Sequence, residues 1–523
     1  MDILERLVAH LRTERAWRVA FVSVFLLEAI VLLSGLGRQW YYFDEWRLVV
    51  ERVAPPTHGV REWFHQLFRP DSEHVIAVPL MIFIPLAKWF GADTYAPFVV
   101  VNLVVRLLTM WLVSDIARRA GARRSTRLAA VLLVALFGSG YESLFGQSLI
   151  FAGLTLVFGL AAIRAVTGPD VPDVRVGLIA GGWLTLAVFC SSYAFPVVVG
   201  VALGCAVRRA GRAAGLAFAV PILVFVSVRA LEGSPYAPQE PFGLDRVPVT
   251  IDYVSAGLTA VGEGITGLRG IGITAFVAIV VMLVFASRTS AQWALSACAA
   301  GGAVLFFAQA SLSRSVFGPD QAASSRYVFF CAIPLLAAIV AAWGDRRFTA
   351  RLAGAVSIVF LLSLSTNVAR AIDGRTFYLS GMEESRQRLM IGLVAVERGA
   401  TDFFPDPEHA IDLREDRIPV FLAWDGAETF LDESRACYER WAGDLAGWGL
   451  DTEGIDPVDE AALLVLVNEY SLGYGPESTL SDLVLFAVSR AESQQVVDQF
   501  LPRYTPLLDR ITPESGIVPR RSC

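Results

Sequence analysis

The segment WRVAFVSVFLLEAIVLLSGL, residues Trp17 to Leu36, is the first of a series of apolar stretches that decide the fold. A helix of about 20 residues spans a bilayer, because each residue adds about 1.5 Å and the hydrocarbon layer measures about 30 Å. The whole chain fits this reading, since 55% of its 523 residues are hydrophobic, 18% are charged and the mean hydropathy is +0.54. These values exclude a single soluble core.

Similar apolar stretches recur as far as Val368 and predict an all-α polytopic membrane protein of about eleven transmembrane helices. The clearest predicted spans are Trp17 to Leu36, Pro97 to Ile116, Leu149 to Val166, Gly177 to Cys190, Leu216 to Val228, Ile271 to Ala286, Trp293 to Ala310, Val328 to Trp343 and Leu352 to Val368. Two shorter spans are predicted at Leu128 to Phe137 and Pro196 to Val207.

Two further apolar segments are predicted not to cross. A crossing at Val75 to Phe90 would place the next Arg-rich loop on the wrong side of the membrane. Its Lys88 and Trp89 suit the headgroup region, so we expect an interfacial helix over residues 75–90. Ile251 to Leu268 is a poor span because it contains Glu263 and several glycines.

Arginines cluster in alternate connections, and this pattern predicts the orientation, because basic loops translocate poorly. The clusters are Arg6, Arg12 and Arg15; Arg118, Arg119, Arg123, Arg124 and Arg127; Arg175; Arg208, Arg209 and Arg212; Arg288; and Arg346, Arg347 and Arg351. All can be cytoplasmic if the number of crossings is odd, which puts the N-terminus inside and the tail outside. Lys88 is the only lysine, a bias that hints at a GC-rich genome, so we expect a bacterial cytoplasmic (inner) membrane.

The composition changes after residue 371. Residues 372–523 hold 28 acidic and 13 basic side chains, a net charge of about −15, and residues 1–371 carry the balance of about +9. Interleaved apolar and charged residues, as in Met382 to Val396, predict a small α or α+β extracytoplasmic domain. We therefore expect two domains, 1–371 and 372–523. Cys437 and Cys523 lie in the second, and the sequence leaves open whether they pair.

The first outward loop, residues 37–74, carries the densest group of candidate site residues. Asp44 and Glu45 follow the aromatic run from Trp40 to Phe43. Such a carboxylate at the membrane surface can act as a general base on a hydroxyl or help to hold a divalent cation. The alternative is an exposed acidic pair beside an interfacial aromatic belt. Asp71, Glu73 and His74 follow at the end of the loop, where His74 can bind phosphate or metal, or simply cap a helix.

The later outward connections add further candidates. Glu142 lies in GSGYESLFGQS between apolar spans, with Tyr141 and Gln147 beside it, and is read either as a site residue or as a solvated carboxylate. Arg314 and Arg326 stand on the side that the basic bias should avoid. Each is expected to face an anionic partner, either a lipid phosphate or pyrophosphate, or a structural carboxylate. Arg229, at the outer end of a span, is a third candidate cation, with an interfacial anchor as the alternative.

The order of these motifs resembles the GT-C superfamily of membrane glycosyltransferases. YYFDEW at residues 41–46, PDSEHVIAVPL at 70–80, GYESLFGQ at 140–147 and SSRYVFF at 324–330 are similar to a bacterial GT-C family whose members read DEW, NEH, ENLLWxFQ and SRY. The resemblance covers roughly residues 40–370. Ser72 stands where an Asn often precedes Glu-His, and Ser143 replaces an Asn, so any role of those amides does not carry over.

The resemblance implies an inverting transfer of a hexosyl or pentosyl unit from a polyprenyl-phosphate donor to an envelope glycan or lipid acceptor. Asp44 would be the general base, with Glu45 orienting it or sharing a divalent ion, Mg²⁺ or Mn²⁺. The donor phosphate would meet Arg326, His74, Arg314 and Arg229, and the substrates would meet Trp46, Glu73, Tyr141, Glu142, Gln147 and Tyr327. The resemblance also implies that the partners are lipids and glycans. The sequence carries no nucleotide-binding motif, which is consistent with this, and we expect no nucleotide cofactor and no nucleic acid. A transporter or flippase of lipid-linked sugars and an oligosaccharide ligase are the alternatives.

Overall fold

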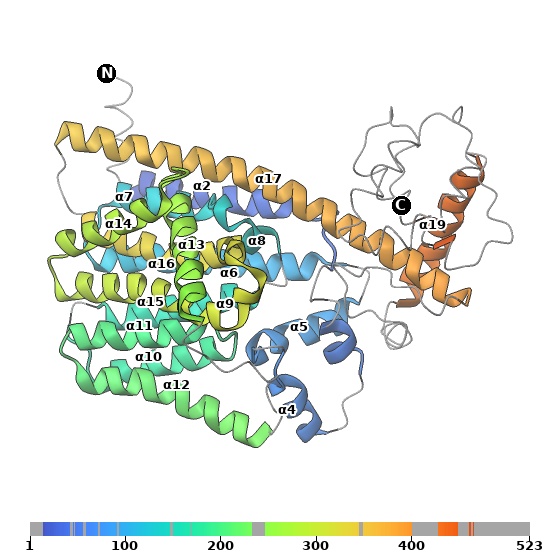
Figure 1. Cartoon of the computed structure of the whole chain (residues 1–523), viewed down its shortest axis with the longest axis horizontal. Coiled ribbons are helices and arrows are strands. Elements are labelled where there is room, and N and C mark those ends of the chain that lie inside the picture. The colour runs from blue at the N-terminus through green and yellow to red at the C-terminus, as the bar shows by residue number, and fades with distance from the viewer. Residues whose placement is uncertain are drawn as a thin grey trace. The chain divides into compact units, whose positions relative to one another are not determined.

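The computed structural model is almost entirely helical, and the residues that it describes contain no β-strand (Figure 1). It describes residues 14–41, 45, 48–55, 59–71, 74–91, 94–146, 150–168, 170–232, 246–344, 349–399, 427–447, 460, 461 and 464. The α-helices are α2 (Glu14–Leu33), α4 (Val60–Phe68), α5 (Ala77–Phe90), α6 (Ala96–Arg119), α7 (Arg124–Ala135), α8 (Tyr141–Phe145), α9 (Ile150–Val166), α10 (Val174–Val188), α11 (Ala194–Val207), α12 (Gly211–Glu232), α13 (Val247–Thr266), α14 (Gly272–Ala286), α15 (Ser290–Arg314), α16 (Ser325–Trp343), α17 (Ala350–Glu397) and α19 (Ala427–Gly447). A π-helical turn, η1 (Val49–Val53), and the 3₁₀ turns η2 (Gly138–Gly140), η5 (Ser315–Phe317) and η6 (Pro319–Ala323) complete the described elements.

The chain forms two compact units. The first, called here the helical unit, comprises Met1–Leu36, Thr57–Phe83 and Phe98–Thr376. The second, the tail unit, comprises Gly37–Pro56, Ile84–Pro97 and Phe377–Cys523. The segment 37–74, which the sequence predicts to be the first outward loop, is therefore divided, since residues 37–56 belong to the tail unit and residues 57–74 to the helical unit.

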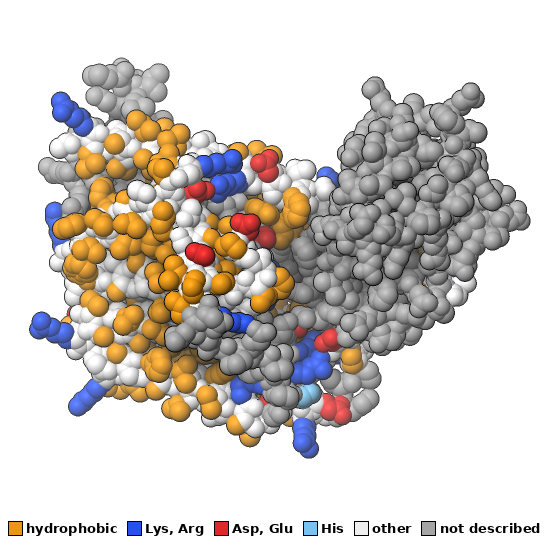
Figure 2. Space-filling view, in the orientation of Figure 1, with side chains coloured by type: hydrophobic (Ala, Val, Ile, Leu, Met, Phe, Trp, Pro, Cys, Tyr) orange, Lys and Arg blue, Asp and Glu red, His pale blue; other side chains and the backbone are white. Residues whose placement is uncertain are grey.

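Six described helices are long and apolar enough to span a membrane, namely α2, α6, α12, α15, α16 and α17. A seventh candidate is the bent pair formed by α7 and the segment Gly138–Phe145, which meet at 42°. The shorter apolar helices α5, α9, α10, α11 and α14 have 14 to 17 residues. Apolar side chains cover much of the visible face of the helical unit, as lipid contact requires (Figure 2).

Helix α13 contains the segment that the sequence marked as a poor span, and it runs across its neighbours in Figure 1. At its start, the Ser311 hydroxyl donates to the Thr250 hydroxyl over 3.3 Å. Near its end, the Asn367 amide donates to the Gly264 carbonyl over 2.9 Å. Gly267 stops the helix with a positive φ of 74°, which glycine adopts without strain. Helix α13 therefore joins the end of α15 to the middle of α17.

A buried ion pair joins α2 to α6. Arg106 Nε donates to Glu28 Oε1 over 2.7 Å, and the two side chains are 2% and 0% exposed. The same guanidinium donates through Nη2 to the Val134 carbonyl of α7 over 2.8 Å and lies 4.6 Å over the ring of Phe329 in α16. One arginine therefore ties four helices together where water cannot solvate it.

The basic connections gather at one end of the helical unit. The start of α2 meets the start of α7 through the ion pair of Glu14 with Arg124. The end of α9 meets the end of α6 through Arg164 and Asp115, and Arg208, after α11, donates to the Val166 carbonyl. We call this the basic end.

Replacing Glu28 with Leu should lower the stability of the folded protein by about 3–5 kcal/mol, because it leaves Arg106 charged and uncompensated in an apolar core. Thermal unfolding in detergent measures the loss. The double variant Glu28→Leu with Arg106→Met should recover much of it, because a well-packed apolar pair carries no desolvation penalty. Arg18→Ala is the control, because the Arg18–Glu14 pair is exposed. Equal losses in the single and the double variant would contradict this account.

Candidate phosphate-binding site

The start of α16 is fixed by a carboxylate from α8. Glu142 Oε2 accepts hydrogen bonds from the Arg326 backbone amide and the Ser324 hydroxyl, each over 3.0 Å. The Ser325 hydroxyl in turn accepts from the Glu142 backbone amide over 3.0 Å. A carboxylate at a helix N-terminus satisfies free amides and meets the positive end of the helix dipole. Glu142 therefore acts as a cap supplied from another helix.

The Arg326 side chain continues from this cap. Its Nε lies 3.8 Å from Glu142 Oε2, and its guanidinium carbon lies 5.4 Å over the ring of Tyr327. The Arg326 side chain is 28% exposed, so it is partly shielded from water but remains accessible. The structure thus brings Glu142, Arg326 and Tyr327 together.

Tyr193, in the turn between α10 and α11, is the centre of the site. Its ring lies 5.7 Å from that of Tyr327 and 5.1 Å from that of His74, both edge-on. Burial, and next the neighbouring Tyr327, raise the pKa of Tyr193 well above its usual range. The positive charges of Arg326 and Arg314 oppose these two effects, because they act to lower the pKa of the same phenol. The rings of Tyr193, Tyr327 and His74 therefore meet from three separate segments of the helical unit.

His74 is held in place by the same turn. Its Nδ1 lies 2.6 Å from the Ser192 hydroxyl, and its backbone forms a tight pair of hydrogen bonds with Asp71. Gln309 of α15 donates to the Ser192 carbonyl over 3.0 Å, which fixes the turn against α15. The imidazole is 8% exposed, so its position is set by packing rather than by solvent.

A buried hydroxyl completes the site. Tyr253 of α13 is 1% exposed, and its hydroxyl has no hydrogen-bond partner among the described residues. Burial, and next the neighbouring Tyr327, raise the pKa of this phenol, while the positive charges of Arg314 and Arg326 act to lower it. An unsatisfied buried hydroxyl is costly, and with positive charge acting on it this hydroxyl is a donor suited to an anion. We call Tyr193, Tyr253, Arg314, Arg326 and Tyr327, with His74, the arginine–tyrosine cluster.

Arg229 has a different environment. It pairs with Glu232 over 2.5 Å, and His65 Nδ1 lies 3.0 Å from the other oxygen of the same carboxylate. The Glu232 side chain is 0% exposed. The structure therefore gives Arg229 a carboxylate partner and does not bring it into the arginine–tyrosine cluster.

Tyr141 packs against α17. A Cβ placed at Gly374 would overlap the Tyr141 side chain, so the ring lies directly on that helix. A cavity of about 510 Å³ lies between the turn after α13 and α17, lined by Gly267, Leu268, Arg269, Ile271, Ser365, Thr366 and Ala369. None of the predicted site residues lines this cavity.

Glu45 belongs to the tail unit and is 1% exposed. The Tyr95 hydroxyl donates to its Oε1 over 2.5 Å, and burial together with this carboxylate raises the pKa of Tyr95. Tyr41 donates to the Gly91 carbonyl over 3.1 Å, and Trp40 stacks on Phe430 with ring centres 5.1 Å apart. Trp40 and Tyr41 are thus core residues of the tail unit rather than parts of an exposed aromatic belt.

Several predicted residues lie outside the described part of the chain, namely Asp44, Trp46, Glu73 and Gln147. Among the described residues, no group of three His, Cys, Asp or Glu side chains is placed to hold a metal ion. The metal hypothesis at Asp44 and Glu45 thus depends on a residue that the structure does not describe.

Two residues of the cluster could not be predicted from the sequence. Tyr193 and Tyr253 lie in or beside apolar stretches, where a tyrosine carries no local signal of a site. A weak signal existed at Tyr193, since the segment SSY at residues 191–193 interrupts an apolar run.

Comparison of the chain with protein-family models, with curated proteins and with solved structures found no match. The function must therefore be inferred from the residues themselves.

Glu142→Ala should destabilise the protein by about 1–2 kcal/mol and speed hydrogen exchange in the first turn of α16, because the amides at its start lose their acceptor. Mass spectrometry of a peptide covering residues 324–330 measures the exchange. Glu142→Gln should be milder, since an amide oxygen still accepts a hydrogen bond.

Glu263→Ala is the matched control for Glu142→Ala. Glu263 Oε1 accepts from the Gly270 amide over 2.7 Å, so its loss removes a similar bond at another site. Exchange over residues 324–330 should stay unchanged in that variant. Equal exchange in both variants would contradict a specific capping role of Glu142.

Proposed function

We propose that the protein is an inverting glycosyltransferase of the bacterial cytoplasmic membrane. It transfers a hexosyl or pentosyl unit from a polyprenyl-phosphate donor to an envelope glycan or lipid acceptor at the outer surface. The observation that carries the proposal is the arginine–tyrosine cluster, where Arg326 lies over the Tyr327 ring and the buried Tyr253 hydroxyl has no hydrogen-bond partner among the described residues. A guanidinium group and a desolvated hydroxyl donor are groups that bind a phosphate.

In this proposal the cluster stabilises the leaving phosphate. The acceptor hydroxyl oxygen attacks the anomeric carbon, the bond from that carbon to the phosphate oxygen breaks, and polyprenyl phosphate leaves with the bonding electron pair. Arg326 and Arg314 neutralise the charge that grows on the leaving oxygen. His74, which lies against the Tyr193 ring, assists them. Electrostatic stabilisation of this kind commonly lowers an enzyme's activation barrier more than any other single effect.

Asp44 remains our choice for the general base that takes the proton of the acceptor hydroxyl. The environment of Glu45 supports assigning the base role to Asp44 rather than to Glu45. Its Oε1 accepts the short hydrogen bond from Tyr95, and the residue is buried, so Glu45 is better suited to orient Asp44 than to meet an acceptor itself.

Two observations support the proposed orientation. The arginine-rich connections gather at the basic end, which is the end expected in the cytoplasm. Cys437 of α19 is disulfide-bonded, a state typical of extracytoplasmic compartments. The proposed partner, Cys523, lies outside the described residues.

With α7 to α8, α9, α10, α11 and α14 added to the six long helices, the proposed number of crossings is eleven.

In nanodiscs, the purified protein should release polyprenyl phosphate and extend an acceptor when given synthetic polyprenyl-phosphate hexoses and pentoses with an envelope lipid extract. Asp44→Asn should lower turnover about 10²–10⁴-fold, the usual contribution of a general base. Arg326→Gln should lower kcat/KM about 10²–10³-fold, because it removes charge from the leaving-group site. Arg175→Gln is the control, because Arg175 is exposed at the start of α10. Full activity of Asp44→Asn would refute the assigned base.

A reporter fused at residue 400 should score as extracytoplasmic, because eleven crossings place the tail outside. Mass mapping without reductant should show Cys437 in a disulfide, and reductant should release it. A cytoplasmic score for the reporter would overturn the placement of the site.

One observation favours transport as the alternative function. Glu28 and Arg106 form a charged pair buried among the spans, and such charges often mark a translocation path. A fluorescent polyprenyl-phosphate sugar in sealed liposomes distinguishes the two functions. A flippase would equalise the label between leaflets without an acceptor, whereas a glycosyltransferase would consume it only with one.

A further inference from the structure

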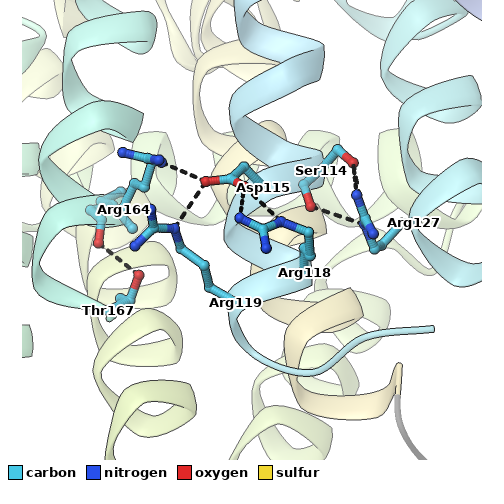
Figure 3. Close-up of polar contacts among 8 residues, drawn as sticks. Ser114, Asp115, Arg118, Arg119, Arg127, Arg164 and Thr167 are labelled. Carbon is cyan, nitrogen blue, oxygen red and sulfur yellow. Dashed lines mark hydrogen bonds and ion pairs between the residues drawn. The ribbon is translucent and has the colours of Figure 1, made fainter. Parts of the chain in front are cut away.

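The basic end contains a cluster of guanidinium groups around one carboxylate. Asp115, near the end of α6, is 8% exposed, and both its oxygens are occupied by arginine (Figure 3). Arg118 donates to Oδ1 through Nε and Nη2, over 2.9 and 2.6 Å. Arg119 and Arg164 each donate to Oδ2 through Nε, over 2.9 and 2.6 Å. Three positive charges thus share one negative charge.

The carboxylate does not use all the donors of these arginines. Within the described residues, Nη1 of Arg118 and both Nη atoms of Arg119 and of Arg164 make no hydrogen bond. The three side chains are 55%, 30% and 31% exposed. Asp115 therefore orders the three guanidinium groups through their Nε atoms and one Nη atom of Arg118, and leaves the other five Nη atoms open to an anion.

Neighbouring charges do not neutralise the cluster. Arg127 lies close by and donates to the Ser114 carbonyl and hydroxyl over 3.2 and 3.1 Å (Figure 3). Glu14 is a further carboxylate acting on Arg127, and it pairs with Arg18 and Arg124. The net charge of the cluster stays positive.

An exposed apolar stripe leads along α6 to this cluster. Val100, Val104, Leu108 and Trp111 are 41–50% exposed and follow each other at intervals of three or four residues, on one face of the helix. Asp115 and Arg118 continue the same spacing. Arg164 lies 5.4 Å over the Trp111 ring, so the aromatic end of the stripe contacts the basic cluster.

We propose that Arg118, Arg119 and Arg164 form a binding site for the phosphate of an anionic phospholipid, whose acyl chain lies along the α6 stripe. A soluble anion would use the guanidinium groups alone, whereas a lipid uses both features. A tryptophan at the boundary and arginines beyond it match the order of hydrocarbon, interface and head group. The site depends on the chain lying in a membrane and is independent of the proposed glycosyl transfer.

Native mass spectrometry of the full-length protein, released from mixed phosphatidylglycerol and phosphatidylethanolamine, tests the site. The wild type should retain phosphatidylglycerol preferentially. The double variant Arg119→Gln with Arg164→Gln should bind it about 30-fold more weakly, because each positive charge near an anionic lipid contributes about fivefold. The matched control, Arg175→Gln with Arg212→Gln, removes two exposed charges and should retain the lipid.

Three results would overturn the proposal. These are equal retention of both lipids by the wild type, an equal loss in the control double variant, and displacement of phosphatidylglycerol by millimolar inorganic phosphate, which would indicate a site for a soluble anion.

A second measurement keeps the arginines intact. Dibrominated phosphatidylglycerol should quench the tryptophan fluorescence of the wild type more than dibrominated phosphatidylethanolamine does, and Trp111→Phe should abolish the difference. A difference that persists in Trp111→Phe would place the lipid elsewhere.

Discussion

The ion pair between Glu28 and Arg106 is the constraint on which the helical unit depends. Neither charge can be solvated there, so each requires the other, and this requirement fixes the register of α2 against α6. Arg106 also donates to the Val134 carbonyl, near the end of α7, which accepts in addition from the Phe137 amide over 3.4 Å. After this point the chain leaves α7 and turns back as α8. That turn brings Glu142 to the start of α16, where it caps the helix and sets the position of Arg326.

Close packing in the turn between α7 and α8 makes this arrangement specific. Asn367 of α17 accepts from the Ser139 amide and donates to the Gly264 carbonyl, so one side chain links the turn to α13. A Cβ at Gly138 would overlap the backbone around Asn367, and one at Gly140 would overlap Phe329. The two glycines of the GSG segment are required for this approach, which connects the buried ion pair to the arginine–tyrosine cluster.

The sequence predicted the helical class and most helix positions, because a bilayer imposes a length and an apolar composition that can be read locally. It also drew attention to Glu142 and Arg326, since charge near apolar spans is unusual. It could not predict that Trp40 and Tyr41 pack inside the tail unit, because an aromatic run has the same composition at an interface and in a core. Nor could the sequence predict that Glu28 pairs with Arg106, because 78 residues separate them and the pairing depends on the tertiary arrangement.

The two ends of the helical unit use arginine in different ways. At the basic end, several guanidinium groups are partly exposed and share Asp115, so their attraction for anions is screened by salt and depends on their number. In the arginine–tyrosine cluster, Arg326 lies over the Tyr327 ring and beside the Glu142 carboxylate, which also caps the start of α16. Its side chain is 28% exposed, close to the 30% of Arg119 and the 31% of Arg164, so exposure does not distinguish the two ends. The surroundings distinguish them, because the arginines at the basic end share one carboxylate with each other, whereas the position of Arg326 is set by the capped start of a helix. The proposed lipid site therefore uses the number of charges, and the proposed leaving-group site uses the fixed position of one.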